Sequence, residues 1–311
     1  MLNLVNFINK DTFLIFSTLV LLAGAALLSE RSGIINIALE GQLIAGVLGY
    51  TLIGFFLKQR SIPDYGLYFI GFGAAIIFVI FLTLIFGFLV VYIGMDQILT
   101  ALALNIIMLG MASFIIVYLK DNPNLILKED YVWLYISDSF KTYLVIDGIN
   151  LSIFYQFFIV LLILLGLHVF LFRTTPGLRI RSCGENPKIT KMNGLSVIKY
   201  RFQALILGAV LIAFASTFFA EWKPDFNGNV NGFGYLGLSM LILGMRNVGL
   251  IAFFSFCFVV LKTLVVSFSG DKYQELITTI NYIFPLMLLS FYGYFYKPKS
   301  GKYAPSKALG L

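Results

Sequence analysis

Long apolar runs, separated by short polar segments, make up most of this chain. A helix that crosses a bilayer needs about 20 apolar residues, and several runs approach or exceed this length. The clear candidates are Thr12 to Leu28, Gly33 to Phe56, Tyr68 to Ile93, Ile98 to Leu119, Ile153 to Phe172, Phe202 to Ala220 and Ile277 to Tyr296. This pattern predicts an all-α, polytopic membrane helix bundle.

The apolar region Tyr235 to Val266 is interrupted by Arg246 and Asn247, which leave a run of 11 residues and a second run of about 18. Eleven residues are too few to cross a bilayer as a helix. The region is therefore either a broken or re-entrant helix buried in protein or two tightly joined helices. Counting both possibilities, we expect eight to ten transmembrane segments.

Composition supports a membrane protein. Of the 311 residues, 59% are hydrophobic and only 12% are charged, whereas soluble domains average about 25% charged residues. No polar segment is long enough for a separate soluble domain, so residues 1–311 are expected to form one transmembrane domain. The net charge of +7 gathers in one loop and the C-terminal tail, which membrane topology explains without nucleic acid.

The most basic segment is the loop from Arg173 to Arg201, with seven positive charges and one negative charge. The positive-inside rule places such a loop in the cytoplasm. Asn186 suits a helix N-cap, Pro187 the first helical position, and Gly194 the residue just past the end. These signals predict a short helix, about Pro187 to Asn193, that docks a cytoplasmic partner; the alternative is an ordinary solvated loop.

The remaining polar segments complete the expected topology. The loop from Lys120 to Asn150 has three lysines and five acidic residues, which fits the external side. The tail from Lys297 to Leu311 has four lysines and no acidic residue, which fits the cytoplasm. Five crossings from an external N-terminus then bring the basic loop inside.

Groups for covalent chemistry are sparse. The chain has no GxxxxGK[ST] phosphate loop, so it does not hydrolyse ATP by that route. The lone His168 lies in an apolar run, where we expect it buried and structural, and it cannot supply a Ser-His-Asp or HExxH site. Cys183 and Cys257 predict no disulfide and no metal-site spacing. We therefore expect a protein that is not an enzyme and has no cofactor or metal of its own.

Polar residues within or at the ends of the spans are costly in lipid, so they face protein or water. Asn36 and Glu40 are four residues apart, which places them on one face if the segment is helical. These residues are candidates for a translocation path: Glu30, Asn36, Glu40, Asp96, Gln97, Asn105 and Asn247. The alternative is structural pairing between helices, and Glu30 and Arg31 could form only an interfacial charge pair.

Three blocks of sequence together resemble one family. The block Ser29 to Gly41, SERSGIINIALEG, is similar to the opening motif of permease subunits of bacterial ABC importers of the nucleoside and simple-sugar class, relatives of ribose and branched-chain amino acid permeases. The basic loop resembles the cytoplasmic loop of that family, and Gly232 to Gly244 resembles its GxGF segment. The stretch Met245 to Gly249 departs from the family pattern.

The resemblance implies a function and partners. The chain would be one of two permease subunits that form a heterodimer. Its other partners would be a cytoplasmic ABC ATPase, which binds ATP and Mg, and an external substrate-binding lipoprotein. It would lie in the bacterial inner membrane and move nucleosides or related small solutes by alternating access. Residues matching the family's loop would couple it to the ATPase: Gly177, Arg179, Gly184, Glu185, Asn186, Pro187 and Gly194.

A stand-alone, ion-coupled secondary transporter is the alternative function. Such a protein needs an ion or proton site within the membrane, for which Glu40 and Asp96 are the candidates. The sequence leaves open which solute is moved and which side chains contact it.

Overall fold

The computed structural model describes residues 10–57, 64–121, 145–146, 149–223, 226–269 and 287. Over these residues the chain is a helix bundle with one small antiparallel strand pair, β1 (Val145–Ile146) and β2 (Ile149–Asn150). Five helices are long and apolar enough to cross a membrane, and a bent pair adds a sixth. The all-helical membrane fold is thus confirmed. Of the predicted run Ile277 to Tyr296, only residue 287 is described. The tail and most of the 120–150 loop lie outside the described residues.

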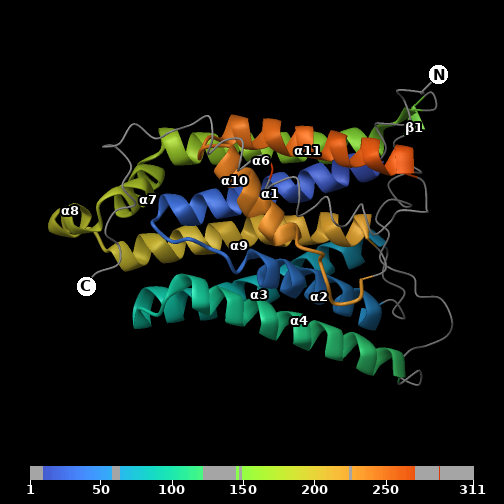
Figure 1. Ribbon diagram of the computed structural model, residues 1–311, viewed down its shortest axis with the longest axis horizontal. Helices are drawn as coiled ribbons and strands as arrows, with labels where there is room; N and C mark the ends of the chain where they lie inside the picture. The colour runs from blue at the N-terminus through green and yellow to red at the C-terminus, as the bar shows by residue number, and fades with distance from the viewer. Residues whose placement is uncertain are drawn as a thin grey trace.

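The long helices match the predicted apolar runs to within a few residues. They run roughly side by side along the long axis of the molecule (Figure 1). They are α1 (Lys10–Arg31), α3 (Asp64–Gly87) continued by the π-helix η2 (Phe88–Ile93), α4 (Gln97–Asp121), α6 (Leu151–Arg173) and α9 (Val197–Trp222). At about 1.5 Å per residue, helices of this length cover the hydrocarbon core of a bilayer.

Helix α1 is the core of the bundle and α4 lies at its surface. In the most apolar 18-residue stretch of α1, 94% is buried, whereas in that of α4 only 22% is buried. Small residues allow α1 and α9 to pack closely: a Cβ added at Gly208 would lie 3.3 Å from the carbonyl oxygen of Ala25. Large apolar side chains of α4, such as Ile106 and Phe114, are exposed, as expected for a surface that faces lipid.

Two short helices begin inside the bundle, α2 (Leu39–Leu57) and α10 (Phe233–Leu243). The prediction of one helix from Gly33 to Phe56 is wrong in its first part, because residues 32–38 are not helical. Gly33 has a φ of +86°, which ends α1, and the chain then runs back along the bundle to the start of α2 (Figure 1). Asn36 therefore lies in this non-helical segment and does not share a helical face with Glu40.

The region around Arg246 consists of two tightly joined helices, α10 and α11 (Val248–Ser269). The turn between them holds two successive non-glycine residues in the left-handed region, Met245 with φ 47° and Arg246 with φ 61°. Such residues are uncommon, and their strain must be held by surrounding contacts. The turn coincides with the stretch that departs from the family pattern.

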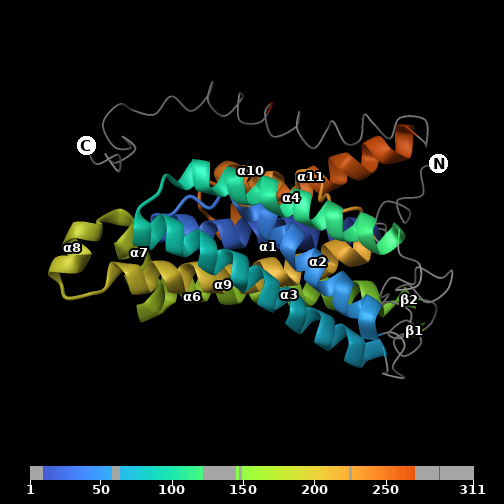
Figure 2. The ribbon, with the colours of Figure 1, turned by 90° about the horizontal axis from the view of Figure 1, so that it is seen from below.

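The basic loop contains more helix than predicted. It folds into α7 (Thr175–Glu185) and the predicted short helix α8 (Pro187–Met192). Helix α7 bends by 70° from the end of α6. In two perpendicular views, α8 lies beyond the end of the spanning helices (Figures 1 and 2).

Candidate functional site

Glu40 joins the starts of the two short helices. Its side chain is 7% exposed, although Glu40 lies in the first turn of α2. One carboxylate oxygen accepts the N–H of Gly232 at 2.8 Å, and the other accepts the N–H of Gly234 at 2.6 Å. Both donors lie at the N-terminus of α10, where free N–H groups and the helix dipole favour a negative charge. Glu40 thus binds α10 to α2 inside the bundle.

Glycine is required where these helices meet. A Cβ added at Gly234 would lie 2.5 Å from the Cα of Glu40, a distance that two carbon atoms cannot share without backbone movement. Gly232 has a φ of 79°, which lets the chain turn into α10. The backbones of α2 and α10 are therefore in direct contact.

Asn105 of α4 adds a third helix to this cluster. Its side-chain oxygen accepts the N–H of Gly41 at 2.8 Å, and its nitrogen donates to the carbonyl of Ile37 and to the hydroxyl of Tyr235, both at 3.0 Å. Asn105 thus binds the irregular segment before α2, α2 itself and α10. We call Asn36, Glu40, Gln42, Thr83, Asn105 and Tyr235 the central cluster.

Asn36 extends the central cluster towards α3. Its nitrogen donates to the Gln42 side-chain oxygen at 2.9 Å, and Gln42 in turn donates to the Thr83 hydroxyl at 3.1 Å. The Asn36 oxygen accepts the N–H of Ala38 at 3.2 Å. Three candidates, Asn36, Glu40 and Asn105, therefore meet in one buried cluster.

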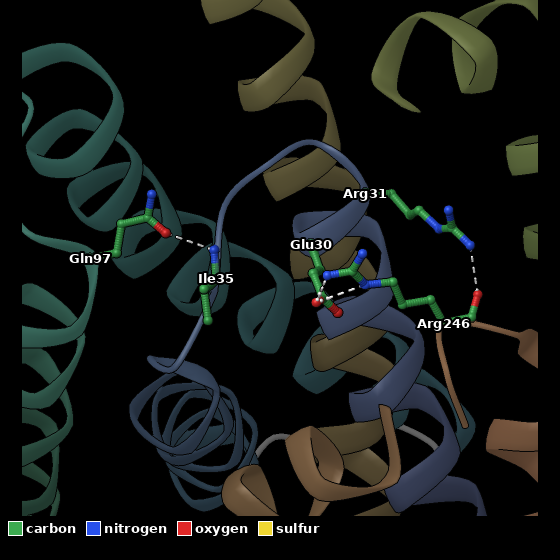
Figure 3. A network of polar contacts seen from close by, with 5 residues as sticks. All are labelled: Glu30, Arg31, Ile35, Gln97 and Arg246. Carbon is green, nitrogen blue, oxygen red and sulfur yellow. Dashed lines mark hydrogen bonds and ion pairs between the residues drawn. The ribbon is translucent and has the colours of Figure 1, made fainter. Parts of the chain in front are cut away.

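A second group of polar residues lies where α1 ends, next to α7, and is drawn in Figure 3. Glu30 accepts two bonds from the Arg246 guanidinium, at 2.9 and 2.5 Å. Arg31 donates to the main-chain carbonyl of Arg246 at 2.9 Å. Glu30 and Arg31 at the end of α1 thus bind the side chain and the backbone of Arg246, in the strained turn between α10 and α11.

Three further candidates lie near this end, where Gln97 contacts the segment before α2 and Asp96 and Asn247 contact residues close to them in the sequence. Gln97 accepts the N–H of Ile35 at 2.8 Å (Figure 3). Asp96 accepts the N–H groups of Ile98 and Leu99, both at 2.9 Å, and so caps α4. Asn247 accepts the N–H of Gly249 at 3.0 Å at the start of α11. Their roles in a path remain predictions.

The short helix α8 has the predicted cap. The Asn186 side chain accepts the N–H of Ile189 at 3.1 Å, Pro187 occupies the first turn, and Gly194 follows with a φ of 75°. The buried Thr190 hydroxyl contacts the Ser182 carbonyl at 2.9 Å, which fixes α8 to α7. Glu185, the last residue of α7, is exposed.

Helix α7 rests directly on the backbone at the end of α1. A Cβ added at Gly184 would lie 2.9 Å from both the Arg31 carbonyl carbon and the Gly33 nitrogen. Gly177 is equally close to α6, 2.8 Å from the Cα of Leu171 by the same measure. Arg179 donates to the Tyr200 hydroxyl at 2.9 Å and so ties α7 to α9.

The structure also shows one functional candidate that the sequence patterns did not reveal, and it contradicts one prediction. Lys262 of α11 is 4% exposed, with its nitrogen 4.8 Å from the Trp222 ring centre and 4.7 Å from that of Phe233. The signal was a single lysine within an apolar run. His168, expected to be buried, is exposed on α6 with its ring 5.0 Å from Phe172. Among the described residues, no three His, Cys, Asp or Glu side chains are placed to hold a metal.

Comparison with known proteins identifies relatives along most of the chain. The model of the family "Branched-chain amino acid transport system / permease component" matches residues 10–291. An uncharacterized protein of Mycoplasma pneumoniae is 28% identical over 94% of both chains. No solved structure matches.

Two relatives carry named transport activities. The guanosine ABC transporter permease protein NupQ of Bacillus subtilis is 28% identical over 75% of this chain and 73% of its own. The putative glucose ABC transporter permease protein TsgC13 of Haloferax volcanii is 26% identical over 73% of this chain and 67% of its own.

Proposed function

Because this chain belongs to the family of permease components of branched-chain amino acid transport systems, we propose that it is the membrane subunit of an ABC importer for nucleosides or related small solutes. It is a multi-pass membrane protein and a transporter subunit rather than an enzyme. The name of the Bacillus subtilis relative, a guanosine ABC transporter permease protein, favours nucleosides, and that of the Haloferax volcanii relative, a putative glucose ABC transporter permease protein, makes small sugars the second candidate.

The observation that carries the proposal is the capped helix α8, which lies beyond the end of the bundle (Figure 1). Ile189 and Met192 are three residues apart on α8, and their side chains are 55% and 86% exposed. An exposed apolar pair on a short, fixed helix is a suitable contact for a cytoplasmic ATPase. We assign α8 as the coupling helix on this basis.

A continuous set of contacts leads from α8 into the bundle. Thr190 fixes α8 to α7, and Gly184 of α7 rests on the backbone at Arg31 and Gly33. Because backbone contacts do not yield as flexible side chains do, a movement of α7 must displace the end of α1. Glu30 and Arg31 then pass that displacement to the turn at Arg246.

The central cluster is the candidate centre of the solute path. It joins α2, α3, α4 and α10, and costly buried polar groups in a membrane bundle commonly line a path or fix helices beside it. In alternating access, a shift of α1 and the α10–α11 turn would change how these helices enclose the centre. ATP and Mg would be bound by the partner ATPase, with no cofactor on this chain.

The remaining parts of the assembly follow from the same proposal. Residues 173–201 and the tail 297–311 would be cytoplasmic, the loop 120–150 external, and the complete chain would have eight to ten spans. The start of α1 lies at the opposite end of the bundle from α8 (Figure 1), which fits an external N-terminus. A second permease subunit, forming a heterodimer, and an external substrate-binding lipoprotein would complete the importer.

Reconstitution in liposomes tests the function. Uptake of labelled guanosine should require this chain, the second permease, the ATPase, the binding protein and ATP, and should fail when the ATPase carries a substitution of its phosphate-loop lysine. Uptake by this chain alone, driven by an ion gradient, would contradict the proposal and favour a secondary transporter.

A further inference from the structure

Two arginines with unused hydrogen-bond donors lie against one aromatic ring where α1, α6 and α7 meet. The guanidinium carbon of Arg181 lies 5.0 Å from the centre of the Phe172 ring, and that of Arg31 lies 5.5 Å from the same centre. Phe172 is the second-to-last residue of α6, Arg31 ends α1, and Arg181 lies in α7. The ring therefore brings two positive charges from different helices to one place.

The protein supplies too few acceptors for these charges. The Nε atoms of Arg31 and Arg181 are buried and have no hydrogen-bond partner among the described residues. Arg31 uses one terminal nitrogen for the Arg246 carbonyl, and in the described part of the chain no hydrogen bond or ion pair is found for Arg181. Buried charged donors are normally paired, so the two Nε–H groups lack acceptors that such groups usually have.

The surrounding charges increase the need for an anion. Three positively charged residues meet here: Arg31 and Arg181 lie against the same Phe172 ring, and Arg31 also donates to the main-chain carbonyl of Arg246 at 2.9 Å. Glu30 is already bound to Arg246, and Glu185 forms no ion pair with Arg181 in the described structure. A singly or doubly charged anion would remove the repulsion and accept the unused N–H groups.

The location narrows the class of anion. The site lies where the apolar helices α1 and α6 end and the basic helix α7 begins, so it is at the membrane surface rather than in a solute path. Arginine guanidinium groups suit phosphate oxygens, and basic pockets between membrane helices on the cytoplasmic side bind anionic lipid headgroups. Leu178 of α7 is 57% exposed on the same helix, which offers apolar contact for a lipid chain.

We propose that Arg31 and Arg181 form a phosphate-binding site, and that its occupant is the headgroup phosphate of an anionic phospholipid. The bound phosphate would link the end of α1 to α7 across Phe172. The proposal depends on membrane insertion but not on the identity of the transported solute, nor on the presence of an ATPase.

Thermal unfolding of the purified full chain in detergent tests the site. The probes are phosphatidylglycerol, the zwitterionic phosphatidylcholine and inorganic phosphate. Phosphatidylglycerol should raise the unfolding midpoint more than phosphatidylcholine does. Arg181→Gln should weaken the apparent affinity for phosphatidylglycerol roughly tenfold, because it removes charge-assisted hydrogen bonds.

Two further variants make the test specific. Arg179→Gln is the matched control on the same helix: Arg179 already donates to the Tyr200 hydroxyl at 2.9 Å, so the lipid preference should persist. Arg181→Lys keeps the charge without the fork of donors, so it should retain an intermediate preference. If Arg181→Gln cannot be purified, Arg181→Lys decides the question.

The outcomes separate the alternatives. Equal stabilisation by both lipids, or an unchanged lipid preference in both Arg181 variants, would overturn the proposal. Stabilisation by inorganic phosphate alone that is lost in Arg181→Gln would support the phosphate site but overturn the lipid as its source. Loss of stability in Glu185→Gln equal to that in Arg181→Gln, with no lipid effect, would show that Arg181 pairs with Glu185 instead.

Discussion

Replacement of Gly184 by alanine should uncouple ATP hydrolysis from transport. The new Cβ would lie 2.9 Å from the Arg31 carbonyl carbon and the Gly33 nitrogen, and still closer to the Arg31 carbonyl oxygen. All three atoms belong to the backbone, and Gly33 itself has a left-handed φ of 86°, so neither side can adjust by rotating a side chain.

The size of the effect follows from these distances. Ordinary contact of a Cβ begins at 3.4 Å, and the Arg31 carbonyl oxygen lies closer than the two atoms at 2.9 Å, so α7 must move away from α1 by more than about 0.5 Å. Overpacking of this kind typically costs about 1–3 kcal/mol. Folded domains are stable by about 5–15 kcal/mol, so the variant should still fold while α7 and α8 are displaced.

The assay is the ratio of solute uptake to ATP hydrolysed in liposomes that contain the complete importer. This ratio should fall several-fold in Gly184→Ala at matched protein content. Gly166→Ala in α6 is the control, because a Cβ there meets nothing within 4 Å. Wild-type coupling in Gly184→Ala would refute the conclusion that the Gly184 contact transmits movement from α8 to α1.

Three other predictions follow from the structure. Glu40→Gln replaces one acceptor oxygen by an amide group facing a backbone N–H, so it should cost about 2–3 kcal/mol and lower the unfolding midpoint; an unchanged midpoint would count against this role. Gly194→Val, at φ 75°, and Pro187→Leu should each destabilise the conformation of α8 by about 1 kcal/mol and so reduce co-purification of the ATPase. Gly194→Asn should not, since asparagine tolerates this conformation. Equal docking in all three variants would identify a solvated loop. Cys183 is fully buried and burial raises the pKa of its thiol, so it is a poor target for a thiol reagent. Topology is better tested with Met192→Cys, because the Met192 side chain is 86% exposed. An impermeant thiol reagent should label this variant in inside-out vesicles but not in intact cells, and labelling of intact cells would contradict a cytoplasmic α8.

Features governed by local chemistry were predictable from the sequence. The long apolar runs became helices because a bilayer-length apolar segment can satisfy its backbone only as a helix. Helix α8 followed from Asn186, Pro187 and Gly194, which act within a few residues of their own position. Helix α7 was missed although its signals were present: Thr174 caps its first turn and Pro176 follows at the start.

Features governed by distant contacts were not predictable. Hydropathy could not distinguish the irregular segment 32–38 from a helix, because its residues are as apolar as those of α2. The partners of Glu40 are 192 and 194 positions away, and nothing near Glu40 in the sequence indicates them. Lys262 was missed for the same reason, since its aromatic partners lie on α9 and at the start of α10.

The bond between Glu40 and the start of α10 has a consequence for synthesis of the protein on the ribosome. At about 5–20 residues per second, the 192 positions from Glu40 to Gly232 take about 10–40 s to translate. During that time the carboxylate lacks the two N–H groups that donate hydrogen bonds to it, and a carboxylate without such bonds is costly to bury. Helix α2 must therefore remain near water, or at least incompletely docked, until the nascent chain has supplied α10.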